Sequence, residues 1–246
     1  DREIRFDINT FRHGDDDDGF MLRDIHFSLA RGEQVALVGP SGSGKTTLAE
    51  LLARFYRVRD GAITMDGINI NDIDNSDYRR LISVVNQDSF LLNDTIEKNI
   101  TLSADEVDAA RLSEAGRLAH IHAFIGQQKT GYDTIISEHG ANLSGGQKQR
   151  ISIARTIFAD TPIVILDEAT SALDSESEQY IQKAIDSLRA NKTLLIIAHR
   201  LSTIIHSDKI VVMNEGRIVE MGSHKELLER NGYYKRLFEI QFNTGD

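Results

Sequence analysis

Short blocks of hydrophobic residues alternate with polar turns along the chain, and their spacing predicts both strands and helices. Residues 4–11 and 22–29 alternate between apolar and polar side chains, as strands of an antiparallel sheet do. Residues 34–39 predict a short buried strand, which a Gly/Ser loop and a helix from Lys45 to about Arg54 follow. A strand that leads through a loop into a helix predicts the start of an α/β core.

A helical pattern interrupts this core. From about Asn93 to Gly126 apolar residues recur at helical spacing, and a further helix is predicted from Ser144 to about Ala159. We therefore expect an inserted helical subdomain over about residues 93–159. The recurring apolar positions are Ile96, Ile100, Val107, Leu112, Leu118, Ile121 and Phe124.

The α/β pattern then resumes. Strands are predicted at 163–167 and 193–198, a helix near 176–188, a hairpin at 209–214 and 217–221, and helices from His224 and Tyr233.

Composition excludes several classes of function. The chain of 246 residues contains no cysteine, which excludes disulfides and thiolate metal sites, and its net charge of −10 argues against a nucleic-acid partner. No apolar run approaches the roughly 18 residues that a membrane span needs. Since residue 1 is Asp, we expect a soluble fragment of a longer chain.

One glycine-rich segment has the spacing of a phosphate-binding loop. It reads Gly39, Pro40, Ser41, Gly42, Ser43, Gly44, Lys45 and Thr46, with Thr47 next, and it lies between a predicted strand and a predicted helix. In such a loop backbone N–H groups surround the β-phosphate, the lysine reaches the β/γ oxygens and the threonine hydroxyl binds Mg²⁺. The segment predicts a nucleoside-triphosphate site that holds ATP and Mg²⁺, with Lys45 as a catalytic residue.

Two acids end the hydrophobic strand 163–167. Asp167 and Glu168 fall at the carboxyl edge of a parallel sheet, where ligands bind. This is the Walker B arrangement, in which Asp167 helps to hold Mg²⁺ and Glu168 polarises the attacking water. Alone, the pair also fits a helix N-cap; beside a phosphate loop the catalytic interpretation is preferred.

A second glycine-rich segment distinguishes the chain from other phosphate-loop proteins. Leu143, Ser144, Gly145, Gly146 and Gln147 stand at the start of a predicted helix, and with the motifs above they resemble the signature of the ABC ATPase family. The resemblance implies an ABC ATPase fold: an α/β phosphate-loop core, an antiparallel β subdomain and an inserted helical subdomain. It also implies that residues 144–147 bind the γ-phosphate of nucleotide held by a partner subunit.

The resemblance assigns further residues one by one. Gln87 matches the Q-loop glutamine, which contacts Mg²⁺ and the attacking water; Asp174 matches the D-loop aspartate, which reaches across the dimer; His199 matches the switch histidine on the γ-phosphate. The family stacks adenine on an aromatic residue of the first sheet. Here His13 holds that position, and Phe11, on the same face of the predicted strand, is the alternative.

Details before the signature resemble the exporter branch of the family. Residues 131–134 with 138–140 match the exporters' X-loop, although Ile135, Ser137 and His139 depart from its common residues. The resemblance implies one nucleotide-binding domain over 1–246 that acts as a homodimer or heterodimer with a transmembrane domain at the cytoplasmic face of the membrane. Soluble ABC ATPases and importer subunits are the alternatives; the single cassette and the X-loop argue against them. The exported substrate is not encoded here.

Overall fold

The computed structural model of the chain describes residues 3–14, 20–86, 89–102, 104, 106–167, 175–189, 192–198 and 201–242. The chain divides into two compact units. Unit 1 comprises Asp1–Arg79, Ile165–Glu168 and Thr193–Asp246, and unit 2 comprises Arg80–Val164 and Ala169–Lys192.

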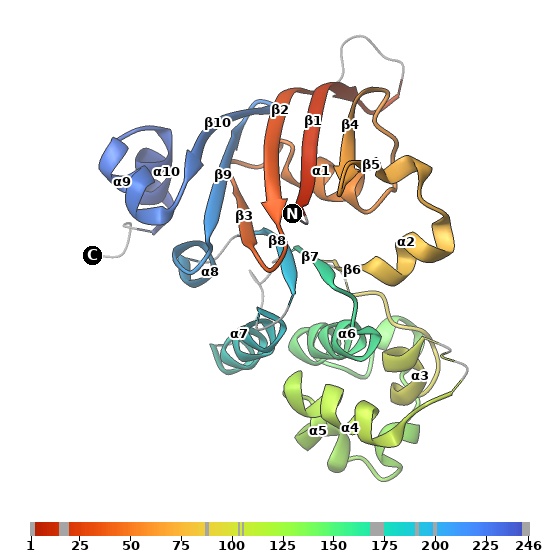
Figure 1. Cartoon of the computed structure of the whole chain (residues 1–246). Helices are drawn as coiled ribbons and strands as arrows, with labels where there is room; N and C mark the ends of the chain where they lie inside the picture. Colours follow the sequence, from red (N-terminus) through yellow and green to blue (C-terminus); the bar gives the residue numbers. More distant parts are fainter. Residues whose placement is uncertain are drawn as a thin grey trace. The chain divides into compact units, whose positions relative to one another are not determined.

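The elements follow the chain in this order (Figure 1). The strands are β1 (Glu3–Arg12), β2 (Met21–Ala30), β3 (Gln34–Val38), β4 (Asp60–Met65), β5 (Ile68–Asn69), β6 (Ile82–Val85), β7 (Ile163–Asp167), β8 (Thr193–Ile197), β9 (Lys209–Asn214) and β10 (Arg217–Gly222). The helices are α1 (Lys45–Leu52), α2 (Asn75–Leu81), α3 (Ile96–Thr101), α4 (Ala109–Leu118), α5 (His122–Gly126), α6 (Gly145–Ala159), α7 (Ser175–Arg189), α8 (Leu201–Ile205), α9 (His224–Arg230) and α10 (Tyr233–Phe242).

An antiparallel sheet of order β2-β1-β4-β5 forms one layer of unit 1. Along β1 the apolar residues Ile4, Phe6 and Ile8 are buried while the residues between them are exposed, as the period of two requires. Phe6 pairs with Phe27 of β2, and the two rings stack with centroids 4.3 Å apart. This cross-strand pair fixes the register of the two strands.

The second sheet of unit 1 carries the phosphate-loop segment. β3 lies between β8 and β9 and is parallel to both, while β10 runs antiparallel to β9. Every residue of β3 and of β8 is buried, which explains why their sequences are continuous hydrophobic runs rather than alternating ones. The loop between β3 and α1 therefore begins at the carboxyl end of a fully buried strand.

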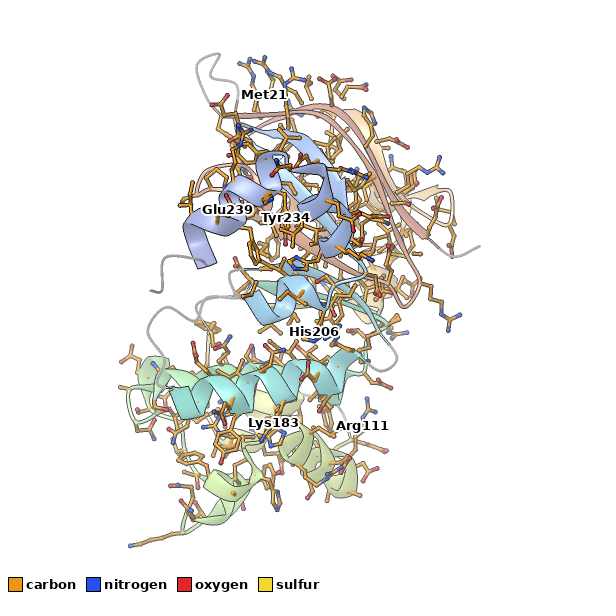
Figure 2. All side chains as sticks on the ribbon, turned by 90° about the vertical axis from the view of Figure 1, so that its left-hand side faces the viewer. Met21, Arg111, Lys183, His206, Tyr234 and Glu239 are labelled. Atoms are coloured by element: carbon orange, nitrogen blue, oxygen red, sulfur yellow. The ribbon has the colours of Figure 1, made fainter. Side chains whose placement is uncertain are left out.

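Unit 2 is built around α6, which packs against α3, α4 and α7. Its apolar residues Ile151, Ala154 and Phe158 are buried. Arg111 of α4, labelled in Figure 2, donates to the backbone carbonyl of Phe158 and places its guanidinium 4.9 Å from the centre of that ring. The signature segment thus begins a helix that is fixed by its neighbours in this unit.

Two helices end the described part of unit 1. α9 begins with a capping box between Ser223 and Glu226. The Glu220 carboxylate accepts the backbone N–H groups of Tyr233 and Tyr234 at the start of α10, at 3.1 and 2.6 Å. Tyr234, labelled in Figure 2, is buried, and its hydroxyl lies 2.7 Å from His224 Nδ1. A carboxylate at a helix N-terminus satisfies free donors and complements the helix dipole.

Most predicted strands and helices are confirmed, and four details are corrected. The first helix ends at Leu52 because Arg54 has a positive φ of 60°. Val107 lies before α4 and is 37% exposed, so it does not belong to the helical core. The short helices α2 and α8 were not predicted. His13 lies beyond the end of β1 and not within it.

Candidate nucleotide site

The loop between β3 and α1 needs glycine where the chain passes other backbone. A Cβ on Gly39 would lie 2.2 Å from the carbonyl oxygen of Met213 in β9. Gly44, the N-cap of α1, has φ 104°, and a Cβ there would lie 2.5 Å from Leu22 Cδ2. The backbone of Met213 leaves no room for a Cβ at Gly39, and the positive φ of Gly44 favours glycine there, so both positions suit glycine.

Lys45 is the first residue of α1 and points back into this loop. Its Nζ donates to the carbonyl oxygens of Gly39 and Pro40, both at 2.9 Å, and the residue is only 6% exposed. Burial lowers the pKa of Lys45, and the charge of Asp167 acts in the opposite direction. An ammonium group that donates to neutral loop oxygens has donors that an anion in the loop can take over. The loop therefore fits a phosphate.

The other residues of the loop are arranged around Lys45. Ser43 is buried, with its hydroxyl 3.5 Å from Lys45 Nζ, and its carbonyl accepts the N–H of Gly216 at 3.1 Å. The remaining predicted loop residues divide by exposure: Ser41, Gly42 and Thr46 are exposed, Pro40 is half-buried, and Thr47 is buried. Thr46 is therefore accessible to a ligand that arrives from solvent.

His13 lies next to this helix. Its Nε2 is 3.3 Å from Thr47 Oγ1, and its exposed ring meets Phe11 and Tyr56 edge-on, with centroids 5.1 and 4.6 Å away. Phe11 itself is 8% exposed. Of the two aromatic candidates, His13 is therefore the one with ring surface to offer a base. Sequence analysis missed Tyr56, which is 44% exposed and carries no motif.

Asp167 ends β7 and is half-buried, as predicted for the carboxyl edge of the sheet. Its charge acts to raise the pKa of Lys45, against the effect of burial. Four other predicted site residues, Glu168, Gln87, Asp174 and His199, lie outside the described residues.

The signature segment begins α6 in unit 2. Ser144 is the N-cap: its Oγ accepts the N–H of Gln147 at 3.2 Å, and the Gln147 side chain accepts the N–H of Ser144 at 2.8 Å. Ser144 and Gly145 are exposed, while Gly146 is buried. The N-cap interpretation of this serine and the binding interpretation are compatible, because a capping hydroxyl keeps its own proton to donate.

The segment before the signature is held by backbone pairing within unit 2. Ile135 forms an antiparallel β-bridge with Thr95, and the N–H of Ile136 donates to the backbone carbonyl of Asp94 at 2.9 Å. Asn142 Oδ1 accepts from both the N–H and the hydroxyl of Ser137, at 3.0 and 2.9 Å. Ile135 is 57% exposed, an apolar side chain on an ordered segment.

Geometry and sequence together define a class of protein. A glycine loop that follows a buried parallel strand and ends at a buried lysine places this chain among the phosphate-loop proteins. Residues 22–171 match the family described as "ABC transporter". The chain belongs to this family.

Two relatives share about half of the residues of this chain. The chain is 49% identical over 239 residues to "ATP-dependent lipid A-core flippase" of Legionella pneumophila (strain Lens), covering 97% of this chain and 40% of that protein. It is 51% identical over 241 residues to the protein of the same name from Alkalilimnicola ehrlichii, covering 98% and 41%. The chain thus spans about two fifths of the length of the curated relatives that it matches.

A solved structure has the same fold. "Structure of a bacterial Atm1-family ABC exporter with ATP bound" matches with a TM-score of 0.91 and 42% identity, covering 100% of this chain and 42% of that one. The predicted ABC ATPase fold is confirmed, as is the resemblance to exporters. In the ranges that the structure describes, no helix combines the length and hydropathy needed to cross a membrane.

Proposed function

We propose that the chain hydrolyses MgATP between two copies arranged head to tail, as one domain that fills residues 1–246. One copy supplies the phosphate loop 39–47, His13, Gln87, Asp167, Glu168 and His199, and the other supplies residues 144–147 and Asp174. Because one chain carries both halves of the site, a homodimer with two working sites is the simplest assembly.

The observation that carries this proposal is the geometry of Lys45. Keeping an ammonium group buried costs free energy, and two loop carbonyls are modest compensation for it. A triphosphate offers charged oxygens at the same place, where charge-assisted hydrogen bonds are about twice as strong as neutral ones. The site is therefore poised for a polyanion.

Divalent metal belongs to the same proposal. Thr46 is exposed and Asp167 is half-buried, and with Gln87 they would offer the oxygen ligands that Mg²⁺ prefers. When bound, Mg²⁺ neutralises charge on the β- and γ-phosphates. Glu168 then accepts the proton of the attacking water, and His199 and Gln87 orient the γ-phosphate and that water.

Ser144 tests the head-to-tail arrangement. Arginine at this position should abolish ATP hydrolysis and leave ATP binding to the monomer unchanged, because the lost contact belongs to the other subunit's nucleotide. Turnover by coupled assay and binding by calorimetry measure the two effects.

Ser223 offers a matched control, since it makes the same capping box at α9. Ser223→Arg should cost a similar cap, worth about 1 kcal/mol of stability, and keep turnover. If Ser144→Arg weakens ATP binding by the monomer, or hydrolyses ATP normally, the composite site is wrong.

For the whole protein, we propose an exporter that moves lipid A-core glycolipid, with this domain bound to a transmembrane domain at the cytoplasmic face of the membrane. The support is that relatives near 50% identity carry that name over nearly all of this chain. ATP-driven closure of the two copies would drive the membrane part between its two states.

Substrate stimulation of the ATPase tests this proposal. The parent protein, reconstituted in phospholipid vesicles, should hydrolyse ATP faster when lipid A-core glycolipid is added than when the same mass of phospholipid is added. Substrate binding favours the closed state in which hydrolysis occurs. Equal rates with both lipids would contradict the proposed substrate and leave the ATPase assignment intact.

A further inference from the structure

We propose that Tyr56 is a positioning residue, which holds the His13 imidazole as the platform for the nucleotide base. The inference rests on the proposed function, because it assigns the base to His13. It adds a residue that no motif in the sequence marks. Four observations in unit 1 carry it.

The backbone leaves the orientation of His13 undetermined. The β1–β2 ladder ends with the pair Arg12 and Met21, whose side chains also meet at 3.0 Å, and Met21 is labelled in Figure 2. His13 is one residue further, and Gly14 follows it with φ 78°. A residue beyond the last pair of a ladder, followed by a residue in the left-handed region, has no strand geometry to direct its side chain. Other side chains must therefore set the ring.

Tyr56 and Phe11 are the two aromatic neighbours of the His13 ring, and Tyr56 is the exposed one of the two. The His13 and Tyr56 ring centroids are 4.6 Å apart with an interplanar angle of 83°, and the His13 and Phe11 centroids are 5.1 Å apart with an angle of 84°. Edge-on contacts of this kind are a preferred geometry for aromatic pairs. Among the described residues, no ring is stacked flat on His13. The two neighbours thus fix the imidazole without stacking on it.

Thr47 gives the ring its third contact. Its hydroxyl lies 3.3 Å from His13 Nε2, and it stands two residues after Lys45 in the same helix. This contact ties the platform to the phosphate loop. A base that stacks on His13 is then held at a set distance from the phosphates that Lys45 binds.

The surroundings of Tyr56 are open. Tyr56 lines a pocket of about 710 Å³ together with Phe11, His13 and Met21. Tyr56 is 44% exposed, and its ring also lies 6.2 Å from the ring of the buried Phe11, between centroids. The ring therefore contacts both His13 and a core side chain, and the test has to separate these two roles.

The test separates the base from the phosphates. Calorimetry compares ATP with inorganic tripolyphosphate, which has no base. Tyr56→Ala should weaken ATP binding between about 2-fold and 10-fold, the equilibrium value of one aromatic pair, and leave tripolyphosphate binding unchanged. Tyr56→Phe should restore ATP binding, because the ring makes the contact. Phe55→Ala, at a neighbouring aromatic residue that is 61% exposed, is the control and should change neither affinity.

A double-mutant cycle decides between positioning and general packing. In a His13→Ala background, Tyr56→Ala should have no further effect on ATP binding. An equal loss for ATP and tripolyphosphate, or an undiminished loss in that background, would overturn the inference. If Tyr56→Ala does not fold, Tyr56→Leu keeps the bulk without the ring and gives the same comparison. Failure of the wild type to bind tripolyphosphate, or unchanged binding by Lys45→Ala, would instead contradict the proposed function.

Discussion

Lys45→Ala should lose tight ATP binding, by roughly 10-fold to 100-fold or more. In the proposed site the lysine would donate charge-assisted hydrogen bonds to the β- and γ-phosphates, and bonds to charged groups are each worth about 1.5–3 kcal/mol. The fold should survive, because removal of a buried ammonium also removes its desolvation cost. Titration with a fluorescent ATP analogue and thermal unfolding without nucleotide measure the two properties.

Lys209 provides the matched control. Its Nζ also donates to a backbone carbonyl, that of Ser28 at 2.9 Å, but it pairs with Glu33 and lies outside the phosphate loop. Lys209→Ala should keep ATP affinity near the wild-type value. Equal affinities for wild type and Lys45→Ala would remove the phosphate-loop assignment.

Glu168→Gln should bind ATP normally and hydrolyse it about 100-fold to 10,000-fold more slowly, the usual contribution of a general base. Glutamine keeps the size of the side chain and loses its basicity. Since opening of the dimer follows hydrolysis in the proposed cycle, ATP-bound dimers should accumulate in this variant. Single-turnover kinetics and size-exclusion chromatography with MgATP follow both effects.

Glu50 in α1 is a suitable comparison, because it lies in the helix after the phosphate loop and is not among the proposed site residues. Glu50→Gln should turn over ATP at the wild-type rate. A Glu168→Gln protein that stays monomeric with MgATP, or that hydrolyses ATP as fast as Glu50→Gln, would argue against the proposed roles.

The sequence predicted the two sheets well because their patterns are physical consequences of burial. β1 must alternate, since one of its faces is buried, and β3 must be hydrophobic throughout, since both of its faces are. The helices α2 and α8 escaped prediction because they span only seven and five residues. A helix of one or two turns has too few positions to display a period of 3.6.

The candidate site also has a part that the sequence predicts and a part that only the folded structure shows. The phosphate loop is continuous in the chain, so its spacing could be read directly. Tyr56 could not be found in this way, because its relation to His13 depends on how α1 and the segment after it return toward the end of β1. The surroundings of Lys45 were also inaccessible from sequence, since its loop carbonyls become its partners only in the folded loop.

The contact between Gly39 and β9 has a consequence for the thermodynamics of binding. Gly39, at one end of the loop, lies close to the Met213 carbonyl, and the Ser43 carbonyl accepts the N–H of Gly216. The β9–β10 hairpin therefore supports the loop through both contacts. A loop already ordered before its ligand arrives loses little conformational entropy on binding. The loop is ordered when the sheet folds, so ordering the loop takes little from the free energy of phosphate binding.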